Sequence, residues 1–266
     1  LGMGLVMNTD FGFGKLMTLN SLGRSTNSVR ANTSRSSANY LQGAASTVSI
    51  LKGLDLTAFV SYRPFDATLN ESGTIRTILK TGYHRTVSEL NRKNNAHQFT
   101  SGGNLHWEAS GFHAGITAIY CHVDKSLQPQ TSQLYRLYYP SGSNFWNASL
   151  DYGYMNYRLS FTGETATGNN NGIATINSLS YLVSNNLSII ALQRFYSKKY
   201  SSLFSSSFSE GGRIQNESGV YIGANWQALR HLSLMLYTDY SYVSQPRYQA
   251  TQPSYCWDNA ITATHT

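Results

Sequence analysis

The chain has few charged residues, few prolines, only two cysteines and no long apolar run. Charged residues make up 12% of its 266 residues and five residues are proline, whereas about 25% of a typical soluble domain is charged. No run approaches the roughly 18 apolar residues of a transmembrane helix, and the mean hydropathy is −0.32. These absences exclude a helical membrane protein and argue against an ordinary charged soluble domain.

Cysteine and histidine give no sign of a metal site. Cys121 and Cys256 lie far apart in the sequence, so an oxidising compartment would permit a disulfide only if the fold brings them together. We expect Cys121, at the end of a predicted strand, to be a small residue of the sheet. The seven histidines form no HxxH or HExxH pattern, so we expect neither a metal nor another cofactor.

What the sequence does contain is an alternation in connector length. Segments of about ten residues are joined alternately by tight turns and by long polar loops, which is typical of an outer-membrane β-barrel. Gly, Asn and Ser at the tight connections tolerate the backbone angles that such turns need. The predicted hairpins pair 40–51 with 54–63, 97–107 with 112–123, 144–152 with 157–164, 173–183 with 187–196, and 219–227 with 232–243.

The predicted strands alternate apolar and polar residues. Leu54, Leu56 and Val60 alternate with Asp55 and Thr57, so apolar side chains would face lipid and polar ones a wet lumen. A soluble β-sandwich or β-helix could show the same alternation. Strands of about 9–11 residues favour the membrane barrel, because globular strands average about 5–6, and no short repeat supports a β-helix. Aromatics reach 13%, with 19 tyrosines, which suits membrane interfaces.

We therefore predict an all-β fold, an antiparallel transmembrane β-barrel in the bacterial outer membrane. We count about ten or eleven strands in a single region over 1–266. The alternative to a sheet closed by these strands is a sheet with one open edge. Leu1 begins inside what looks like a strand, and 261–266 looks like a polar tail without a closing aromatic residue. We expect a fragment of a larger barrel that lacks a signal peptide and any N-terminal periplasmic domain.

The first long loop carries a helix signal. Thr86 followed by Glu89 is a capping-box pattern, which predicts a short helix over 86–93. One interpretation is a loop that folds locally to satisfy its own backbone. The other is a plug or partner-docking element, for which Tyr83, His84 and Arg85 would supply stacking, hydrogen bonding and charge. The candidate residues are Thr81, Gly82, Tyr83, His84, Arg85, Thr86 and Glu89.

The second candidate loop is rich in Ser and Gly over 205–213. This composition suits an ordered loop folded over a barrel mouth. Its candidate residues are Phe204, Phe208, Glu210, Gly211 and Arg213. The Lys and Arg residues behind the net charge of +7 are scattered among the loops, as is ordinary for solvated loops. The alternative interpretation is that these basic loops bind lipopolysaccharide phosphates or an anionic ligand at the barrel mouth.

Several segments resemble, in the same order, parts of large Bacteroidota envelope proteins described as helix-hairpin-helix domain proteins. The resemblance covers nearly the whole chain and is to their C-terminal barrel-like region; the helix-hairpin-helix part, which gives those proteins a DNA-binding label, is absent here. It implies an outer-membrane barrel of poorly defined role and supplies no catalytic residue. The segments are 12–15, 41–45, 81–90, 102–105, 124–125, 128–129, 200–204, 208–211 and 216–223.

The functional prediction is a non-enzymatic barrel with a structural, transport or envelope-assembly role. Expected partners are outer-membrane lipid, lipopolysaccharide and other envelope proteins. A DNA-uptake barrel is an alternative that rests on the family label, but no nucleic-acid recognition motif is present, so we expect no sequence-specific nucleic-acid binding. A barrel enzyme acting on lipid or peptide is the other alternative, although the sequence has no GxSxG motif.

Overall fold

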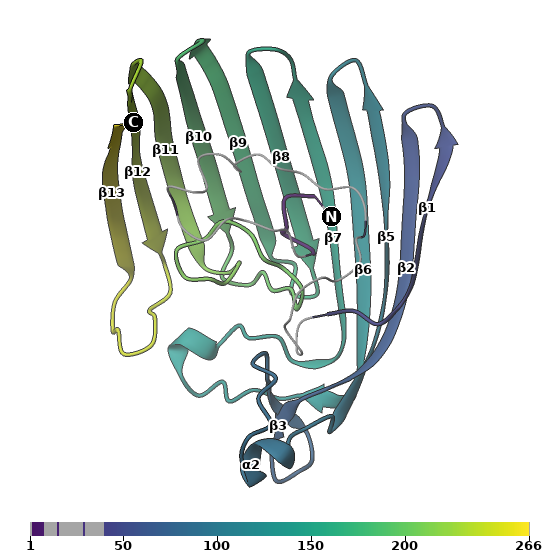
Figure 1. Ribbon diagram of the computed structural model, residues 1–266. Coiled ribbons are helices and arrows are strands. Elements are labelled where there is room, and N and C mark those ends of the chain that lie inside the picture. Colours follow the sequence, from purple (N-terminus) through teal and green to yellow (C-terminus); the bar gives the residue numbers. More distant parts are fainter. Residues whose placement is uncertain (1, 8–14, 16–28, 30–39, 266) are drawn as a thin grey trace.

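The computed structural model describes residues 2–7, 15, 29 and 40–265. They form one large antiparallel sheet in which strands adjacent in the main path follow sequence order (Figure 1). All neighbours in this path pair antiparallel, as the predicted hairpins require. The strands of the path are β1 (Gly43–Leu51), β2 (Leu54–Phe65), β5 (Ala96–Ala109), β6 (Phe112–Leu127), β7 (Gly142–Met155), β8 (Leu159–Gly168), β9 (Ile173–Ser184), β10 (Leu187–Tyr196), β11 (Glu217–Leu229), β12 (Leu232–Val243) and β13 (Ser254–His265).

The remaining elements are short and belong to the long loops. A small hairpin pairs two strands and touches β6 through one parallel pair, Ile75 with Leu127. Among the described residues, no helix is long and apolar enough to cross a membrane. The short elements are β3 (Ala67–Leu69), β4 (Ile75–Ile78), α2 (Val87–Leu90) and the 3-10 helix η1 (Leu134–Arg136).

Short turns lie at one end of the sheet and long loops at the other (Figure 1). The β5–β6 turn shows why the sequence turns there: Ser110 and Gly111 both have positive φ, 51° and 83°, as the tightest hairpin turns require. The opposite end carries the loops over 66–95, 128–141, 197–216 and 244–253, whereas β8 and β9 are joined by only 169–172. The five predicted hairpins are therefore confirmed, and most strands extend beyond their predicted ends.

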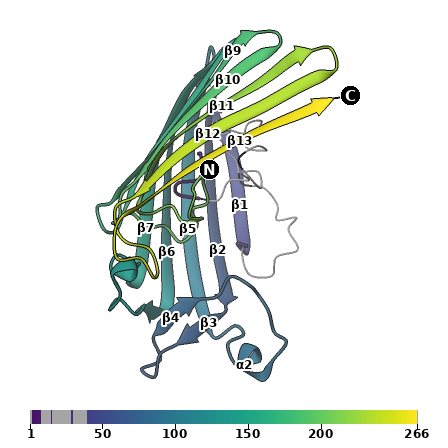
Figure 2. The same ribbon diagram turned by 90° about the vertical axis from the view of Figure 1, so that its left-hand side faces the viewer.

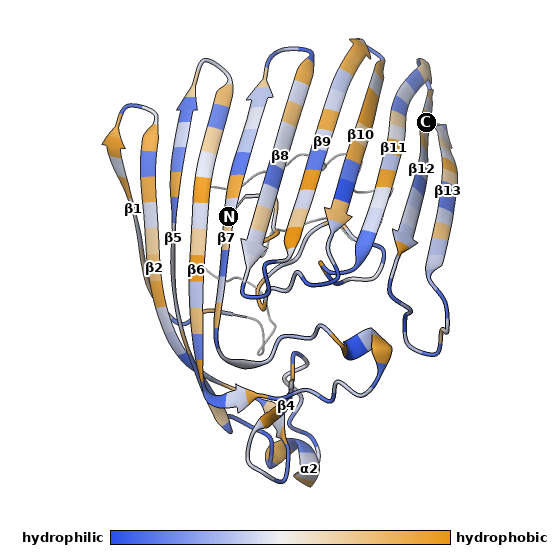
Figure 3. Ribbon diagram, turned by 180° about the vertical axis from the view of Figure 1, so that it is seen from behind, coloured by the Kyte–Doolittle hydropathy of each residue, from blue (hydrophilic) through white to orange (hydrophobic). Residues whose placement is uncertain are grey.

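The two faces of the sheet differ as the alternation predicts, with bands of opposite hydropathy along the strands (Figure 3). On the outer face, Leu56 and Leu150 are 42% and 49% exposed. On the inner face, their neighbours Thr57 and Ser149 are 1% and 5% exposed. At these positions of β2 and β7, apolar side chains point outward and polar ones are buried inside, which is the reverse of an ordinary soluble protein.

The inner face is covered by the N-terminal segment and by the long loop between β10 and β11. Residues 2–7 and the loop over 197–216 pack against β8 to β11, and the sheet curves around them (Figure 2). Met3 and Leu5 are fully buried there, in a cluster with Leu192, Tyr196 and Phe208. The centre of the curved sheet is therefore filled by packed side chains.

Several expectations need correction. Closure into a barrel is not confirmed, and where one open edge was expected as an alternative there are two: in the described part of the chain, β1 pairs only with β2 and β13 only with β12. The expected polar tail is the strand β13, paired with β12 from Val243–Ser254 to Leu232–His265. The missed signal was the alternation of Tyr255, Trp257 and Ile261, all of which face outward.

Two further boundaries differ from the prediction. Residues 2–7 form no strand, apart from an isolated bridge at Gly2, because the N–H groups of Met3 and Leu5 donate to the Glu164 side chain and not to a neighbouring strand. The helix predicted over 86–93 exists but is shorter, at Val87–Leu90 with Thr86 as its N-cap. Both cysteines are free, Cys121 buried in β6 and Cys256 partly buried in β13.

Candidate functional site

An ion-pair network crosses the inner face at β10, β11 and β12. Arg194 Nε lies 2.6 Å from Glu217 Oε1, and Arg194 Nη1 lies 2.7 Å from Asp239 Oδ1. The side chains of all three residues are at most 2% exposed. Charges so deeply buried are tolerated only when they are paired and hydrogen-bonded, so the network fixes how these three strands face the interior.

Lys15 extends this network to the edge of the sheet. Its Nζ lies 2.6 Å from Glu210 Oε2, 2.8 Å from Asp239 Oδ2 and 3.0 Å from Asp258 Oδ2. Burial by itself lowers the pKa of Lys15, but hydrogen bonds to Asp239, Glu210 and Asp258 outweigh it and raise the pKa above its ordinary 10.5. Lys15 is therefore a stable cation that connects the second candidate loop to β12 and β13.

The second candidate loop is folded inward and held by backbone contacts. Glu217 accepts hydrogen bonds from the N–H groups of Glu210 and Gly211, at 2.9 and 3.2 Å. Tyr196 donates its hydroxyl to the carbonyl of Phe208 at 2.7 Å. The Phe208 ring is 7% exposed and lies beneath the Arg194 guanidinium, 4.9 Å from it. The loop therefore fills the space inside the sheet.

The N-terminal segment is bound to the same region. The Glu164 carboxylate accepts the N–H of Met3 at 2.7 Å and that of Leu5 at 3.1 Å. From the second loop, Tyr200 donates its hydroxyl to the Leu5 carbonyl at 2.7 Å, and Ser207 donates to the Met3 carbonyl at 2.9 Å. Residues 2–7 thus lie between the sheet and the loop, with their backbone groups satisfied from both sides.

A second polar cluster lies on the inner face of β5, β6 and β7. The His106 and His113 rings stack with centroids 5.9 Å apart, and Asp151 is 1% exposed. Gly115, on the strand between His106 and Asp151, leaves room for the carboxylate: a Cβ there would lie 2.5 Å from Asp151 Oδ1. In the described part of the chain, no group of three or more His, Cys, Asp or Glu side chains is placed to hold a metal ion.

The first candidate loop forms its own lobe at the long-loop end, with α2 and the β3–β4 hairpin. The capping box is confirmed: Thr86 Oγ1 accepts from the Glu89 N–H, and Glu89 accepts from the Thr86 N–H. His84 Nε2 lies 2.7 Å from Asp66 Oδ2, and the Arg85 guanidinium lies over the Tyr83 ring at 4.1 Å. Gly82 has a φ of +64°. These contacts fit the local-folding interpretation, and partner binding by this loop stays a prediction.

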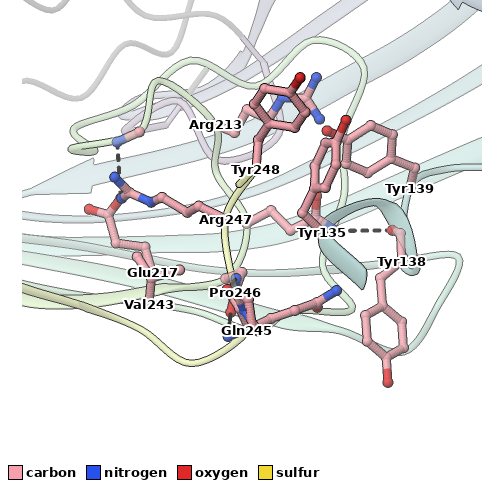
Figure 4. Close-up of a pocket in the computed structure, with 13 residues that line it drawn as sticks. Tyr135, Tyr138, Tyr139, Arg213, Glu217, Val243, Gln245, Pro246, Arg247 and Tyr248 are labelled. Atoms are coloured by element: carbon pink, nitrogen blue, oxygen red, sulfur yellow. Dashed lines mark hydrogen bonds between the residues drawn. The ribbon is translucent and has the colours of Figure 1, made fainter. Parts of the chain in front are cut away.

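A pocket lies where three long loops meet (Figure 4). The cavity is about 220 Å³, and its lining combines four tyrosines with two arginines. The Arg213 guanidinium lies 4.4 Å from the centre of the Tyr139 ring. The lining side chains that carry this character are Tyr135, Tyr138, Tyr139, Arg213, Arg247 and Tyr248.

The structure divides the predicted loop residues between these regions. Gly211 and Arg213 line the pocket, Phe208 and Glu210 contact the ion-pair network at Arg194 and Lys15, and Phe204 packs against the core cluster that contains Met3 and Leu5. No candidate residue was predicted in the loop over 128–141 or in the loop over 244–253. The tyrosines crowded into 135–139 were the available signal.

Comparison with models of known protein families finds no match for this chain, and comparison with curated proteins finds none either. The resemblance to Bacteroidota envelope proteins therefore stays a prediction.

Proposed function

We propose that the chain forms part of an outer-membrane β-barrel protein with a non-enzymatic role in envelope structure, transport or assembly. The observation that carries the proposal is an apolar row across the outer face. Leu56 pairs with Leu105, Leu105 with Ile116, and Ile116 with Leu150. All four side chains are between 38% and 57% exposed. A continuous apolar surface of this kind needs an apolar environment.

Aromatic side chains flank this aliphatic row toward both ends of the strands. Toward the turns, Trp107 and Phe112 are exposed on the outer face; toward the long loops, Tyr120 pairs with Trp146 and Tyr240 with Trp257. Outer-membrane barrels carry such aromatic girdles where the wall meets the membrane interfaces. The arrangement supports a membrane position with the two girdles at the two interfaces.

The open edges set a requirement for this proposal. In a bilayer, the backbone groups of β1 and β13 that face away from the sheet must be paired, because lipid offers no hydrogen bonds. Further strands, from the same polypeptide or a partner, would have to pair with these edges. Because the described interior is filled with packed side chains, a protein that acts through its loops is favoured and an open diffusion channel is disfavoured.

Site-directed labelling of neighbouring residues tests the proposal. In a cysteine-free background, Leu150→Cys and Ser149→Cys carry a nitroxide label at adjacent positions of β7, and Leu56→Cys and Thr57→Cys repeat the comparison on β2. We expect lipid-soluble oxygen to relax the labels at 150 and 56 strongly, and those at 149 and 57 weakly. Heat-modifiable gel mobility confirms that each variant is folded. Strong relaxation by a water-soluble nickel chelate at 150 and 56 would overturn the membrane assignment.

A further inference from the structure

We propose that the pocket between the loops over 128–141, 197–216 and 244–253 binds an acidic sugar residue, a pyranose that carries a carboxylate or phosphate group, as one unit of an anionic polysaccharide. This goes beyond the proposed function, since it depends on the geometry of the loops and not on membrane insertion.

The pocket is built by hydrogen bonds between the three loops. Gln215 donates from Nε2 to the carbonyl of Tyr138 at 2.9 Å, and Asn216 donates from Nδ2 to the carbonyl of Gln245 at 2.9 Å. Gln245 in turn donates from Nε2 to the carbonyl of Leu134. Each loop is therefore tied to another, so the lining is organised before a ligand arrives, which lowers the cost of binding.

The charge of the pocket is positive. Within the part of the chain that the structure describes, neither Arg213 nor Arg247 has a carboxylate within ion-pair distance. Glu217, the acidic residue in the lining, is already bound to Arg194 and to the N–H of Gly211. Guanidinium groups without an acidic partner suit a carboxylate or phosphate, which they can bind with two parallel hydrogen bonds.

The tyrosines supply surfaces that suit a sugar. Tyr135 meets Tyr139 at an interplanar angle of 84° and Tyr248 at 68°, with ring centroids 6.3 and 5.4 Å apart. The rings therefore form walls at steep angles to one another and not a flat platform. Each ring offers an apolar face for sugar C–H groups and a hydroxyl for sugar oxygens.

The same geometry disfavours a nucleic-acid strand. Single strands are bound in long basic grooves where successive bases stack on aromatic rings, whereas this cavity is about 220 Å³ and one face of Tyr139 is taken by Arg213. Pockets for drug-sized ligands measure about 300–1,000 Å³. A single acidic unit of a longer chain fits the smaller volume.

Isothermal titration of the folded, detergent-solubilised full chain tests the inference. The probes are trigalacturonic acid and mannose 6-phosphate, with maltotriose and mannose as neutral partners and a ten-residue thymidylate as the nucleic-acid arm. We expect at least one acidic sugar to bind, its neutral partner to bind at least tenfold more weakly, and added salt to weaken binding.

Three variants locate the site. Arg247→Gln and Arg213→Gln should each weaken acidic-sugar binding about tenfold or more, as expected for a lost charge-assisted hydrogen bond. Tyr248→Leu should weaken it too, and this side chain is 63% exposed, so folding is not at risk. Arg158→Gln removes the same charge at the turn end and should leave binding unchanged.

Failure of this inference can be told apart from failure of the membrane proposal, because none of these variants changes a side chain on the outer face of the strands. Equal binding of acidic and neutral sugars, no binding of either acidic sugar, or an equal loss in the Arg158→Gln variant would overturn the inference. Tighter binding of the thymidylate than of both acidic sugars would also overturn it and identify the pocket as a nucleic-acid site.

Discussion

Arg194 and Asp239 lie 45 residues apart in the sequence and two strands apart in the sheet, yet they form a two-pronged ion pair, with Nη1–Oδ1 at 2.7 Å and Nη2–Oδ2 at 3.2 Å. The strand between them carries Gly219, where a Cβ would lie 2.6 Å from the Arg194 guanidinium carbon. The missing side chain lets the guanidinium cross β11. A single glycine thus makes room for the most deeply buried cation of the described network.

Removing this cation should destabilise the fold strongly. Arg194→Met leaves the buried carboxylates of Glu217 and Asp239 without the guanidinium that pairs with both of them. We therefore expect a loss of about 3–5 kcal/mol in the free energy of unfolding. Urea unfolding followed by tryptophan fluorescence measures it. Arg158→Met, at an exposed position, should change stability by less than about 0.5 kcal/mol. Similar losses in the two variants would contradict a structural role for the network.

The contribution of Lys15 should persist into alkaline conditions. Because its pKa is raised above the ordinary 10.5, its stabilisation is fully present below that value and is lost only as pH rises through the higher folded pKa. We expect Lys15→Met to be less stable than the unchanged protein by the same margin at every pH from 7 to 10. Lys52→Met, at an exposed turn residue, is the control and should show no such margin. A margin that disappears by pH 10 would show that the ion pairs do not hold Lys15 charged.

Glu164 should control the position of the N-terminal segment. Met3 is fully buried and its N–H donates to Glu164, so a Met3→Cys variant, with Cys121 and Cys256 replaced by serine, should react slowly with a water-soluble maleimide. Adding Glu164→Ala removes the acceptor for two backbone N–H groups, and we expect labelling at least tenfold faster. Glu108→Ala, which removes an exposed carboxylate, should leave the rate unchanged. Fast labelling without any substitution at Glu164 would mean that residues 2–7 do not stay against the sheet.

The hairpins could be predicted because their signals are local. A residue pair such as Ser110 and Gly111 adopts positive φ within the turn itself, and the capping box at Thr86 and Glu89 needs only four residues. β13 was missed because Asn259 interrupts its outward apolar set, and its pairing with β12 outweighs the weak local pattern. Strand propensity depends on the neighbouring strand as much as on the residues themselves.

The sequence by itself determined which side chains share a face, since alternation is a property of every extended backbone. It also determined the positions of the turns. Only the tertiary structure decided what fills the inner face and which residues meet there: strand register brings Arg194 to Asp239, and Lys15, from a distant part of the chain, reaches Asp239 as well. The pocket at Tyr135, Arg213 and Arg247 arises in the same way. The physical reason is that such contacts join segments whose meeting depends on the curvature of the whole sheet, which no local stretch of residues encodes.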